Sequence, residues 1–136
     1  MSAKKADSRE SVVFLSAVRT PFGTFGGKLK ALSPIDLAVH ASKAAIERAG
    51  IAATDVDQTI FGNVLYTTSD SIYFARHVSL KSGCRQETSA LTLNRLCGSG
   101  FQAVVSGAQE IILGDASSVS LGAPSRCRRH RTSRAD

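Results

Sequence analysis

The sequence lacks any apolar run near the roughly 18 residues that a membrane-spanning helix needs, which excludes a helical membrane protein. Its first residues, 1–11, carry charged side chains and no apolar segment, so we predict a flexible N-terminus without a secretory signal. Cysteine is also scarce, and the three present are odd in number and lack the spacing of a metal site: Cys84, Cys97 and Cys127. This pattern predicts no disulfide framework and a reducing compartment, for which the cytoplasm is the expected location.

The positive charge of the chain is concentrated at one end. The formal net charge is +6, but residues 122–136 carry five arginines and one aspartate, so the rest of the chain carries only +2. A charge cluster at a terminus is usually solvated, and we predict a disordered basic tail there. The length of 136 residues and the hydrophobic content of 43% are typical of one soluble globular domain, and because its body carries little net charge we do not expect it to bind nucleic acid.

Three segments have helical patterns. The first begins at Ser33 and Pro34, a good cap followed by proline at the first helical position, and ends at Gly50. The second spans about 72–83, and the third spans 99–113 and ends at Gly114. In the third, the large apolar residues are expected to form one face: Phe101, Val104, Val105, Ala108, Ile111 and Ile112.

Four short apolar segments are predicted as strands: 12–18, 57–64, 89–93 and 115–121. They alternate with the three helices in the order β-α-β-α-β-α-β. This order predicts an α/β fold with a mainly parallel sheet covered by helices over residues 12–121. In such sheets, reactive residues lie where strands lead into helices.

The segment 94–100 lies at such a place and reads Asn-Arg-Leu-Cys-Gly-Ser-Gly. It puts Cys97 at the start of the third helix, where the helix dipole stabilises a thiolate by about 0.3–1 kcal/mol. The thiolate is the reactive form of cysteine. Gly98 and Gly100 are expected to allow a tight turn and the approach of a substrate carbonyl. We therefore predict a cysteine nucleophile for acyl transfer; the alternative is a buried structural cysteine with glycines that serve only the turn.

Other candidate side chains are assigned structural roles. His40 lies within an apolar helical pattern, which favours a packed position. His77 is expected to pack or to line a loop, and Cys84 to lie in a loop without function.

Several motifs, in order along residues 12–114, resemble the N-terminal part of thiolases, above all of 3-ketoacyl-CoA thiolases. The motifs are Arg-Thr-Pro-Phe-Gly at 19–23, Asp-Leu-Ala at 36–38, Gly-Asn-Val at 62–64 and Ala-Arg-His-Val at 75–78. The most specific is Asn-Arg-Leu-Cys-Gly-Ser-Gly-Phe-Gln-Ala at 94–103. The resemblance implies a partial thiolase N-terminal domain.

The resemblance also implies a reaction and a role for Cys97. Thiolases convert a 3-ketoacyl-CoA and CoA to an acyl-CoA and acetyl-CoA, or run the reverse condensation. Cys97 would carry the acyl group as a thioester. Its backbone N–H would donate to an oxyanion, and one such donor contributes about 3–4 kcal/mol. Coenzyme A is then a substrate, no bound cofactor or metal is expected, and the strand at 90–93 would pair subunits of a homo-oligomer.

In the family, the histidine that activates the cysteine and a second cysteine lie in a C-terminal half. The resemblance therefore implies that these 136 residues carry an incomplete domain that is inactive alone. The apolar face of the helix at 99–113 would pack against that half. The fourth strand would leave an exposed edge, which favours aggregation.

The basic tail at 122–136 has a simple explanation in terms of reading frame. Thiolases of this type continue with a sequence like Gly-Thr-Glu-Ser-Met-Ser-Gln-Ala-Pro-Tyr-Val-Ala. Written in GC-rich codons and read one nucleotide later, this gives Ala-Pro-Ser-Arg-Cys-Arg-Arg-His-Arg-Thr-Ser, which is the sequence of residues 123–133. We therefore hypothesise that the tail, with Cys127 and His130, is translated out of frame; resequencing the locus tests this.

Two other functions are compatible with parts of the sequence. The arginine-rich tail is compatible with a non-catalytic basic interaction module, which steeply salt-dependent binding would reveal. A β-ketoacyl-synthase-like condensing enzyme also uses a cysteine on this fold. The Asn-Arg-Leu sequence before Cys97 favours a thiolase.

Overall fold

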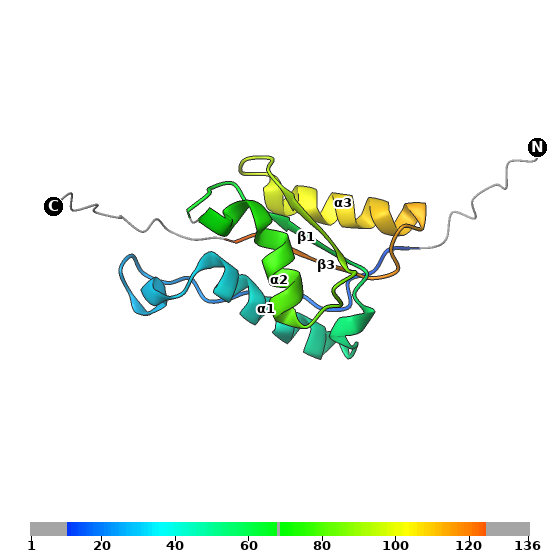
Figure 1. Cartoon of the computed structure of the whole chain (residues 1–136), viewed down its shortest axis with the longest axis horizontal. Coiled ribbons are helices and arrows are strands. Elements are labelled where there is room, and N and C mark those ends of the chain that lie inside the picture. Colours follow the sequence, from blue (N-terminus) through cyan, green and yellow to red (C-terminus); the bar gives the residue numbers. More distant parts are fainter. Residues whose placement is uncertain (1–10, 68, 125–136) are drawn as a thin grey trace, which may run out of the picture.

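A computed structural model describes residues 11–67 and 69–124 (Figure 1). Its helices and strands alternate along the chain as α1 (Pro34–Ala49), β1 (Gln58–Gly62), α2 (Phe74–Ser82), β2 (Ser89–Leu93), α3 (Ser99–Leu113) and β3 (Val119–Gly122). Short 3₁₀ helices form at Lys28–Ala31, Ala53–Asp55 and Ser69–Tyr73. The α/β class predicted from the sequence is confirmed, and no helix of the described residues is long and apolar enough to cross a bilayer.

The three strands form one parallel sheet in the order β2-β1-β3. Gln58 at the start of β1 pairs with Ser89 on one side and with Val119 on the other. Helices α1 and α2 lie on one side of the sheet and α3 on the other (Figure 1). The carboxyl ends of all three strands therefore point to the same edge of the sheet, where β2 leads into the turn before α3.

Helix α1 forms where its start and stop signals predict it. The Ser33 hydroxyl accepts the backbone N–H of Asp36 at 3.0 Å, and the Asp36 carboxylate accepts the backbone N–H of Ser33 at 2.9 Å. This reciprocal pair satisfies two N–H groups that the first turn leaves without helical partners. At the other end Gly50 takes a left-handed conformation with φ of 70°.

The apolar core lies on the α1 and α2 side of the sheet. One cluster joins these helices to β1 and consists of Ile35, Ala38, Phe61, Phe74, Ala75 and Val78. The rings of Phe61 and Phe74 lie 5.8 Å apart at its centre. A smaller cluster joins the end of α1 to the following loops through Ile46, Val56 and Cys84. This side of the sheet therefore supplies most of the buried apolar surface of the described chain.

The strand predicted at 12–18 is absent from the described structure. This segment is irregular, and Val13, Phe14 and Leu15 are largely exposed. An apolar run becomes a strand only when it exchanges backbone hydrogen bonds with a neighbouring strand, and this segment pairs with none of the three described strands. The prediction of four strands was therefore wrong for the described residues, which form three.

The face of α3 that contacts the sheet differs from the predicted apolar face. Its buried residues are small: Ser99, Ala103 and Gly107. A Cβ atom on Gly107 would lie 2.9 Å from a methyl carbon of Leu121, so glycine lets the helix approach β3 closely. Phe101, in contrast, is 82% exposed, and Ile112 is also exposed. The large apolar side chains thus form an uncovered flank of α3 in the described chain.

The fourth predicted strand, 115–121, begins later than expected, at Val119, and ends at Gly122. Residues 115–118 instead form a turn around Asp57, whose carboxylate accepts the backbone N–H groups of Ser117 at 2.9 Å and Ser118 at 3.2 Å. The same carboxylate pairs with Arg85 at 3.2 Å. Two predicted segments lie largely outside the described residues. Of the N-terminal segment 1–11 only residue 11 is described, and of the basic tail at 122–136 only residues 122–124, so Cys127 and His130 are not.

Candidate active site at the turn between β2 and α3

Cys97 lies on the turn that connects the end of β2 to the start of α3, as predicted. Its side chain is exposed and not part of the core. The alternative interpretation, a buried structural cysteine, is therefore wrong. Within the described residues the thiol makes no hydrogen bond and no ion pair, so it is open to an approaching electrophile.

The residue before the thiol, Leu96, has a left-handed backbone with φ of 49°. It is the one residue other than glycine with positive φ in the described chain. This conformation costs a residue with a Cβ atom about 1–2 kcal/mol. Strain of this kind is found at functional sites when the surroundings hold it in place. No feature of leucine itself could have predicted it.

Hydrogen bonds from both sides hold this turn. The Leu96 N–H donates to the Asn94 side-chain oxygen at 2.9 Å, and the Leu96 carbonyl accepts the Ser99 hydroxyl at 2.7 Å. The Ser99 hydroxyl in turn accepts the Arg95 N–H at 2.8 Å. The sequence-based prediction missed Asn94 and Ser99 as site residues; asparagine two positions before a turn residue is the one signal that could have indicated the first.

The first turn of α3 has free backbone N–H groups. Gly98 precedes the helix, and no side chain caps it. Among the described residues the N–H groups of Cys97, Gly100 and Phe101 donate no hydrogen bond. Free N–H groups at a helix start, together with the helix dipole, favour a negatively charged atom. The turn therefore combines an exposed thiol with donors that can stabilise an oxyanion.

The predicted glycines do not determine the turn. Gly98 has φ of −88°, which any residue can adopt, and a Cβ atom there would lie 3.4 Å from the Arg95 carbonyl oxygen. A Cβ atom on Gly100 would make an ordinary contact of 3.5 Å with Ala123. A substrate-related role for these two glycines stays a prediction. Beside this turn, Gly62 leaves no room for a side chain, because a Cβ atom there would lie 2.6 Å from the Cβ atom of Ser99.

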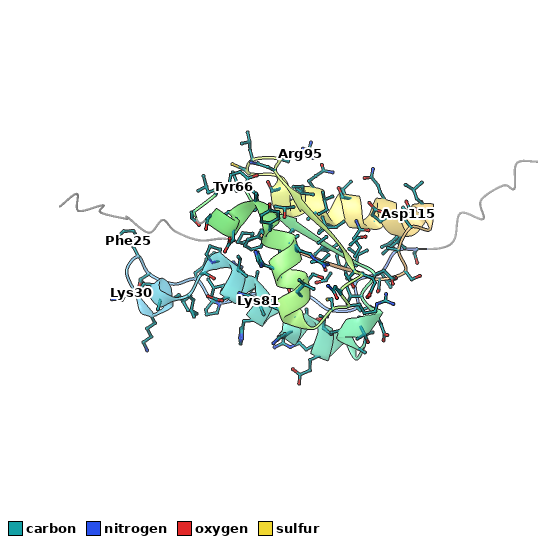
Figure 2. All side chains as sticks on the ribbon, in the orientation of Figure 1. Phe25, Lys30, Tyr66, Lys81, Arg95 and Asp115 are labelled. Carbon is teal, nitrogen blue, oxygen red and sulfur yellow. The ribbon has the colours of Figure 1, made fainter. Side chains whose placement is uncertain are left out.

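The carboxyl end of β1 also reaches this turn. The Asn63 N–H donates to the Leu93 carbonyl at 2.9 Å, and its buried side chain donates to the Ser71 carbonyl at 3.0 Å. The Asn94 side chain reaches the Val64 carbonyl at 3.5 Å. Figure 2 shows Arg95 and Tyr66 near the start of α3, with Asp115 at the far end of that helix. The loops after β1 and β2 thus meet beside Cys97.

Histidine and the second described cysteine lie elsewhere. His40 is exposed on α1, so its predicted packed position is wrong: it lies on the side of the helix that faces away from the core. His77 packs edge-on against the Tyr73 ring with centroids 6.4 Å apart, as predicted. Cys84 lies in a loop, as predicted, and is buried. No group of side chains suited to a metal ion occurs within the described ranges, and metal-free chemistry stays a prediction.

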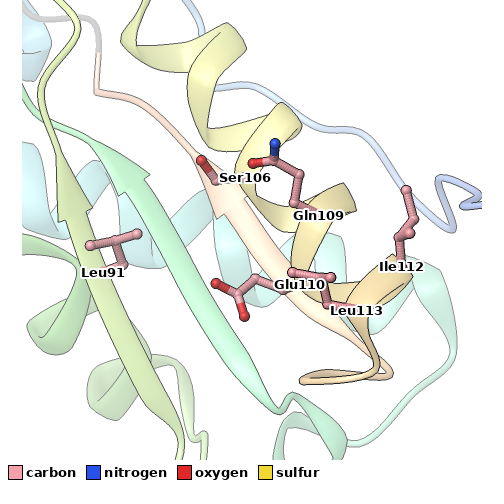
Figure 3. Close-up of a pocket in the computed structure, with 6 residues that line it drawn as sticks. All are labelled: Leu91, Ser106, Gln109, Glu110, Ile112 and Leu113. Carbon is pink, nitrogen blue, oxygen red and sulfur yellow. The ribbon is translucent and has the colours of Figure 1, made fainter.

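A shallow cavity of about 480 Å³ lies away from the thiol, between β2 and the second half of α3 (Figure 3). It is lined by Leu91, Ser106, Gln109, Glu110, Ile112 and Leu113. None of these residues belongs to the turn of Cys97. The cavity is therefore a hollow beside the uncovered flank of α3, and the candidate site is the turn itself.

The chain is similar to thiolases in both sequence and fold. The family model for the thiolase N-terminal domain matches residues 12–124. The mitochondrial 3-ketoacyl-CoA thiolase of Homo sapiens is 50% identical over 111 residues, which are 82% of this chain and 28% of that protein. Beta-ketothiolase BktB of Cupriavidus necator is 46% identical over 104 residues, which are 76% of this chain and 26% of the relative.

Solved structures agree with these relatives. The crystal structure of human mitochondrial 3-ketoacyl-CoA thiolase in complex with CoA has a TM-score of 0.73 and 52% identity, and the match covers 75% of this chain and 26% of that one. The Bacillus anthracis acetyl-CoA acetyltransferase has a TM-score of 0.76 and 34% identity, with 91% of this chain and 33% of that one covered. The chain thus spans about a quarter to a third of the length of the relatives it matches, and it belongs to the thiolase family through its N-terminal domain.

Proposed function

We propose that this chain provides the acyl-accepting part of a thiolase-class acyltransferase. Its substrates would be a 3-ketoacyl-CoA and CoA, or two acyl-CoA molecules in the reverse condensation. The observation that carries the proposal is the exposed Cys97 thiol beside free N–H groups at the start of α3, in a member of this family. Coenzyme A acts as a substrate, and no metal or bound cofactor takes part.

The geometry supports a definite sequence of steps. The Cys97 thiolate attacks the 3-keto carbonyl, and a sulfur–carbon bond forms while negative charge moves to the oxygen. The carbon–carbon bond then breaks, acetyl-CoA leaves after taking up a proton, and the acyl group stays on sulfur. The thiol of CoA displaces it as acyl-CoA and returns the thiolate. The free Cys97 N–H is suited to the oxyanion, since a positioned donor of this kind is worth about 3–4 kcal/mol.

Within the described residues no titratable side chain contacts the thiol, so the base that activates Cys97 would come from outside them. We therefore expect the chain alone to accept an acyl group slowly and to show no turnover with acetoacetyl-CoA and CoA. The sequence leaves two alternatives. The match to the thiolase N-terminal domain favours a thiolase over a β-ketoacyl-synthase-like condensing enzyme. The basic interaction module depends on residues outside the described ranges.

Acyl transfer to Cys97 can be tested with radiolabelled acetyl-CoA and peptide mapping. We expect acetyl label on the peptide with Cys97 and not on the peptide with the buried Cys84. The Cys97→Ser protein should lose the label, because its hydroxyl is a far weaker nucleophile without a base. Equal labelling of the peptides with Cys84 and Cys97, or label that persists on the peptide with residue 97 in Cys97→Ser, would contradict the proposal.

Two further parts of the proposal concern partners and location. We infer that β2 is an interface strand of a homo-oligomer, because it is an edge strand with Ala90 and Leu91 exposed. Sedimentation of Leu91→Lys tests this and should give monomers. We propose the cytoplasm as the location because the few cysteines, odd in number, fit a reducing compartment, although the human relative's name places that protein in mitochondria. Imaging of a fusion of residues 1–20 to a fluorescent protein tests this, and mitochondrial import would contradict it.

A further inference from the structure

Cys97 makes no hydrogen bond of its own among the described residues, so its neighbours must set the direction of its thiol and its N–H. The immediate neighbour is Leu96, with φ of 49°. The peptide group between Leu96 and Cys97 contains the Leu96 carbonyl and the Cys97 N–H, which point in opposite directions because a peptide is planar. Fixing the carbonyl therefore fixes the N–H.

Ser99 is the residue that fixes this carbonyl. Both its hydroxyl, at 2.7 Å, and its backbone N–H, at 3.1 Å, donate to the Leu96 carbonyl oxygen. The hydroxyl also accepts the Arg95 N–H at 2.8 Å. One buried side chain thus connects the peptide group between Asn94 and Arg95 to the peptide group after Leu96, and only 3% of Ser99 is exposed.

Two other residues hold this arrangement. Gly62 at the end of β1 leaves the space that Ser99 occupies, since a Cβ atom there would come within 2.6–2.9 Å of its Cβ, carbonyl carbon and oxygen. On the other side of Leu96, the Asn94 side chain accepts the Leu96 N–H at 2.9 Å. Asn94 is exposed, so its bond is independent of the packing that holds Ser99.

We infer that Ser99, assisted by Asn94, is a positioning residue for acyl transfer, which keeps Leu96 left-handed so that the Cys97 N–H faces the oxyanion. This inference rests on the proposed function of Cys97. Loss of the Ser99 hydroxyl would leave the Arg95 N–H without its acceptor and allow Leu96 to relax to an ordinary φ. The thiol would remain exposed, but the peptide that carries the Cys97 N–H would turn.

Two probes separate positioning from simple reactivity. p-Nitrophenyl acetate acylates sulfur: a sulfur–carbon bond forms, an oxyanion develops on the carbonyl oxygen, and nitrophenolate leaves. Iodoacetamide alkylates sulfur: a sulfur–carbon bond forms and iodide leaves, without an oxyanion. The ratio of the two rate constants at Cys97, measured by mass spectrometry of the peptide, therefore reports the oxyanion donor. A general loss of stability changes both rates together.

Ser99→Ala should lower the ratio about tenfold, less than the 10²–10³ for complete removal of an oxyanion donor, while alkylation stays within about twofold. Asn94→Ala should lower it severalfold. The matched control is Ser79→Ala, because Ser79 is a fully buried helical serine whose hydroxyl has no partner in the described residues. This control should leave both rates within about twofold.

The outcomes distinguish the inference from the proposed function. If Cys97 in the unsubstituted protein has the same ratio as in urea-unfolded protein, the proposed acyl acceptor is wrong. If the ratio of acylation to alkylation is higher in the folded protein than in the unfolded protein, but Ser99→Ala does not lower it, the inference alone is wrong. Circular dichroism checks whether each variant folds. If Ser99→Ala does not fold, Asn94→Ala decides: a lowered ratio of acylation to alkylation supports the inference, and an unchanged ratio overturns it.

Discussion

Helices α1 and α3 are of nearly equal length, 16 and 15 residues, but their first turns use the free backbone N–H groups differently. Before α1, Ser33 is extended with ψ of 161°, which lets its hydroxyl reach the Asp36 N–H. Before α3, Gly98 has ψ of 2°, and no side chain caps the helix. The start of α1 is closed by its own side chains, and the start of α3 is open to a ligand beside Cys97.

The two faces of the sheet also differ in how well their apolar side chains are covered. On the α1 side, Phe74 is buried against Phe61 in a continuous core. On the α3 side the contact with the sheet is made by small residues, and the large apolar side chains face outward. Stability therefore depends mainly on the α1 and α2 face, while the α3 face carries the reactive turn and an apolar flank that another part of the family's fold can cover.

The largest expected difference between the faces is in aromatic truncation. Phe74→Ala should reduce the free energy of unfolding by about 3–5 kcal/mol, because it leaves a cavity beside Phe61. Phe101→Ala should change it by less than about 0.5 kcal/mol, because its ring is exposed on α3. Urea unfolding followed by circular dichroism measures both.

A large effect of Phe101→Ala would show that the flank of α3 is covered in solution. Repeating the titration at several protein concentrations would then sharpen the comparison, because cover by a second copy makes stability depend on concentration. A small effect of Phe74→Ala would contradict the assignment of the core to the α1 and α2 face.

Glycine-to-alanine changes on the two sides of the turn should have opposite effects. Gly62→Ala should destabilise the protein by about 1–3 kcal/mol, because the new methyl group meets backbone atoms of Ser99. Gly98→Ala should leave stability unchanged or raise it by up to about 1 kcal/mol. The φ of −88° at this position suits alanine, and alanine restricts the unfolded chain more than glycine does. Thermal unfolding distinguishes these, and equal losses would contradict the packing described for Gly62.

The sequence was sufficient to predict the elements whose signals are local. The serine, proline and aspartate that start α1 act within four residues, and β2 and α3 have the predicted bounds. The position of Cys97 followed from those bounds alone. The direction of the apolar face of α3 did not follow, because helical spacing cannot tell whether a helix packs by its large or its small residues.

Features that depend on distant partners were not predictable. Residues 12–18 have a strand-like composition, but a strand also needs a pairing partner, and this segment pairs with none of the described strands. The left-handed Leu96 is fixed by side chains of Asn94 and Ser99 and by the space at Gly62, which is more than 30 residues away in sequence. The serine was expected only as a helix residue, since its two hydrogen bonds depend on the path of the turn.

A smaller effect is expected from opening the cap of α1. Ser33→Ala should cost about 1 kcal/mol, because the Asp36 N–H loses its acceptor. It should leave the acylation-to-alkylation ratio at Cys97 unchanged, because α1 lies on the opposite side of the sheet. Lys43→Ala, an exposed change in the middle of α1, is the control and should be nearly neutral. A changed ratio in Ser33→Ala would contradict the separation of the two helix starts.

The smallest expected effect is a pH dependence confined to the start of α1. Hydrogen bonds from the Ser33 hydroxyl and N–H lower the pKa of Asp36 in the folded protein, because they favour the charged carboxylate. A lowered folded pKa gives stability that is complete above the unfolded value, about 3.9, and is lost as the pH falls through the folded value. As the pH falls below about 4, the midpoint urea concentration of unfolding should therefore fall less in Asp36→Asn than in the unsubstituted protein.

The same titration separates the two helix starts. The difference in unfolding free energy between Ser33→Ala and the unsubstituted protein should narrow below about pH 4, because the Asp36 carboxylate loses its charge in both proteins. It should not disappear, because the bond from the Asp36 N–H to the Ser33 hydroxyl does not titrate. Gly98→Ala should keep a constant difference in stability from the unsubstituted protein at every pH, because no acidic side chain lies in the first turn of α3. Identical acid profiles for Asp36→Asn and the unsubstituted protein would show that the closed start of α1 contributes no charge-dependent stability.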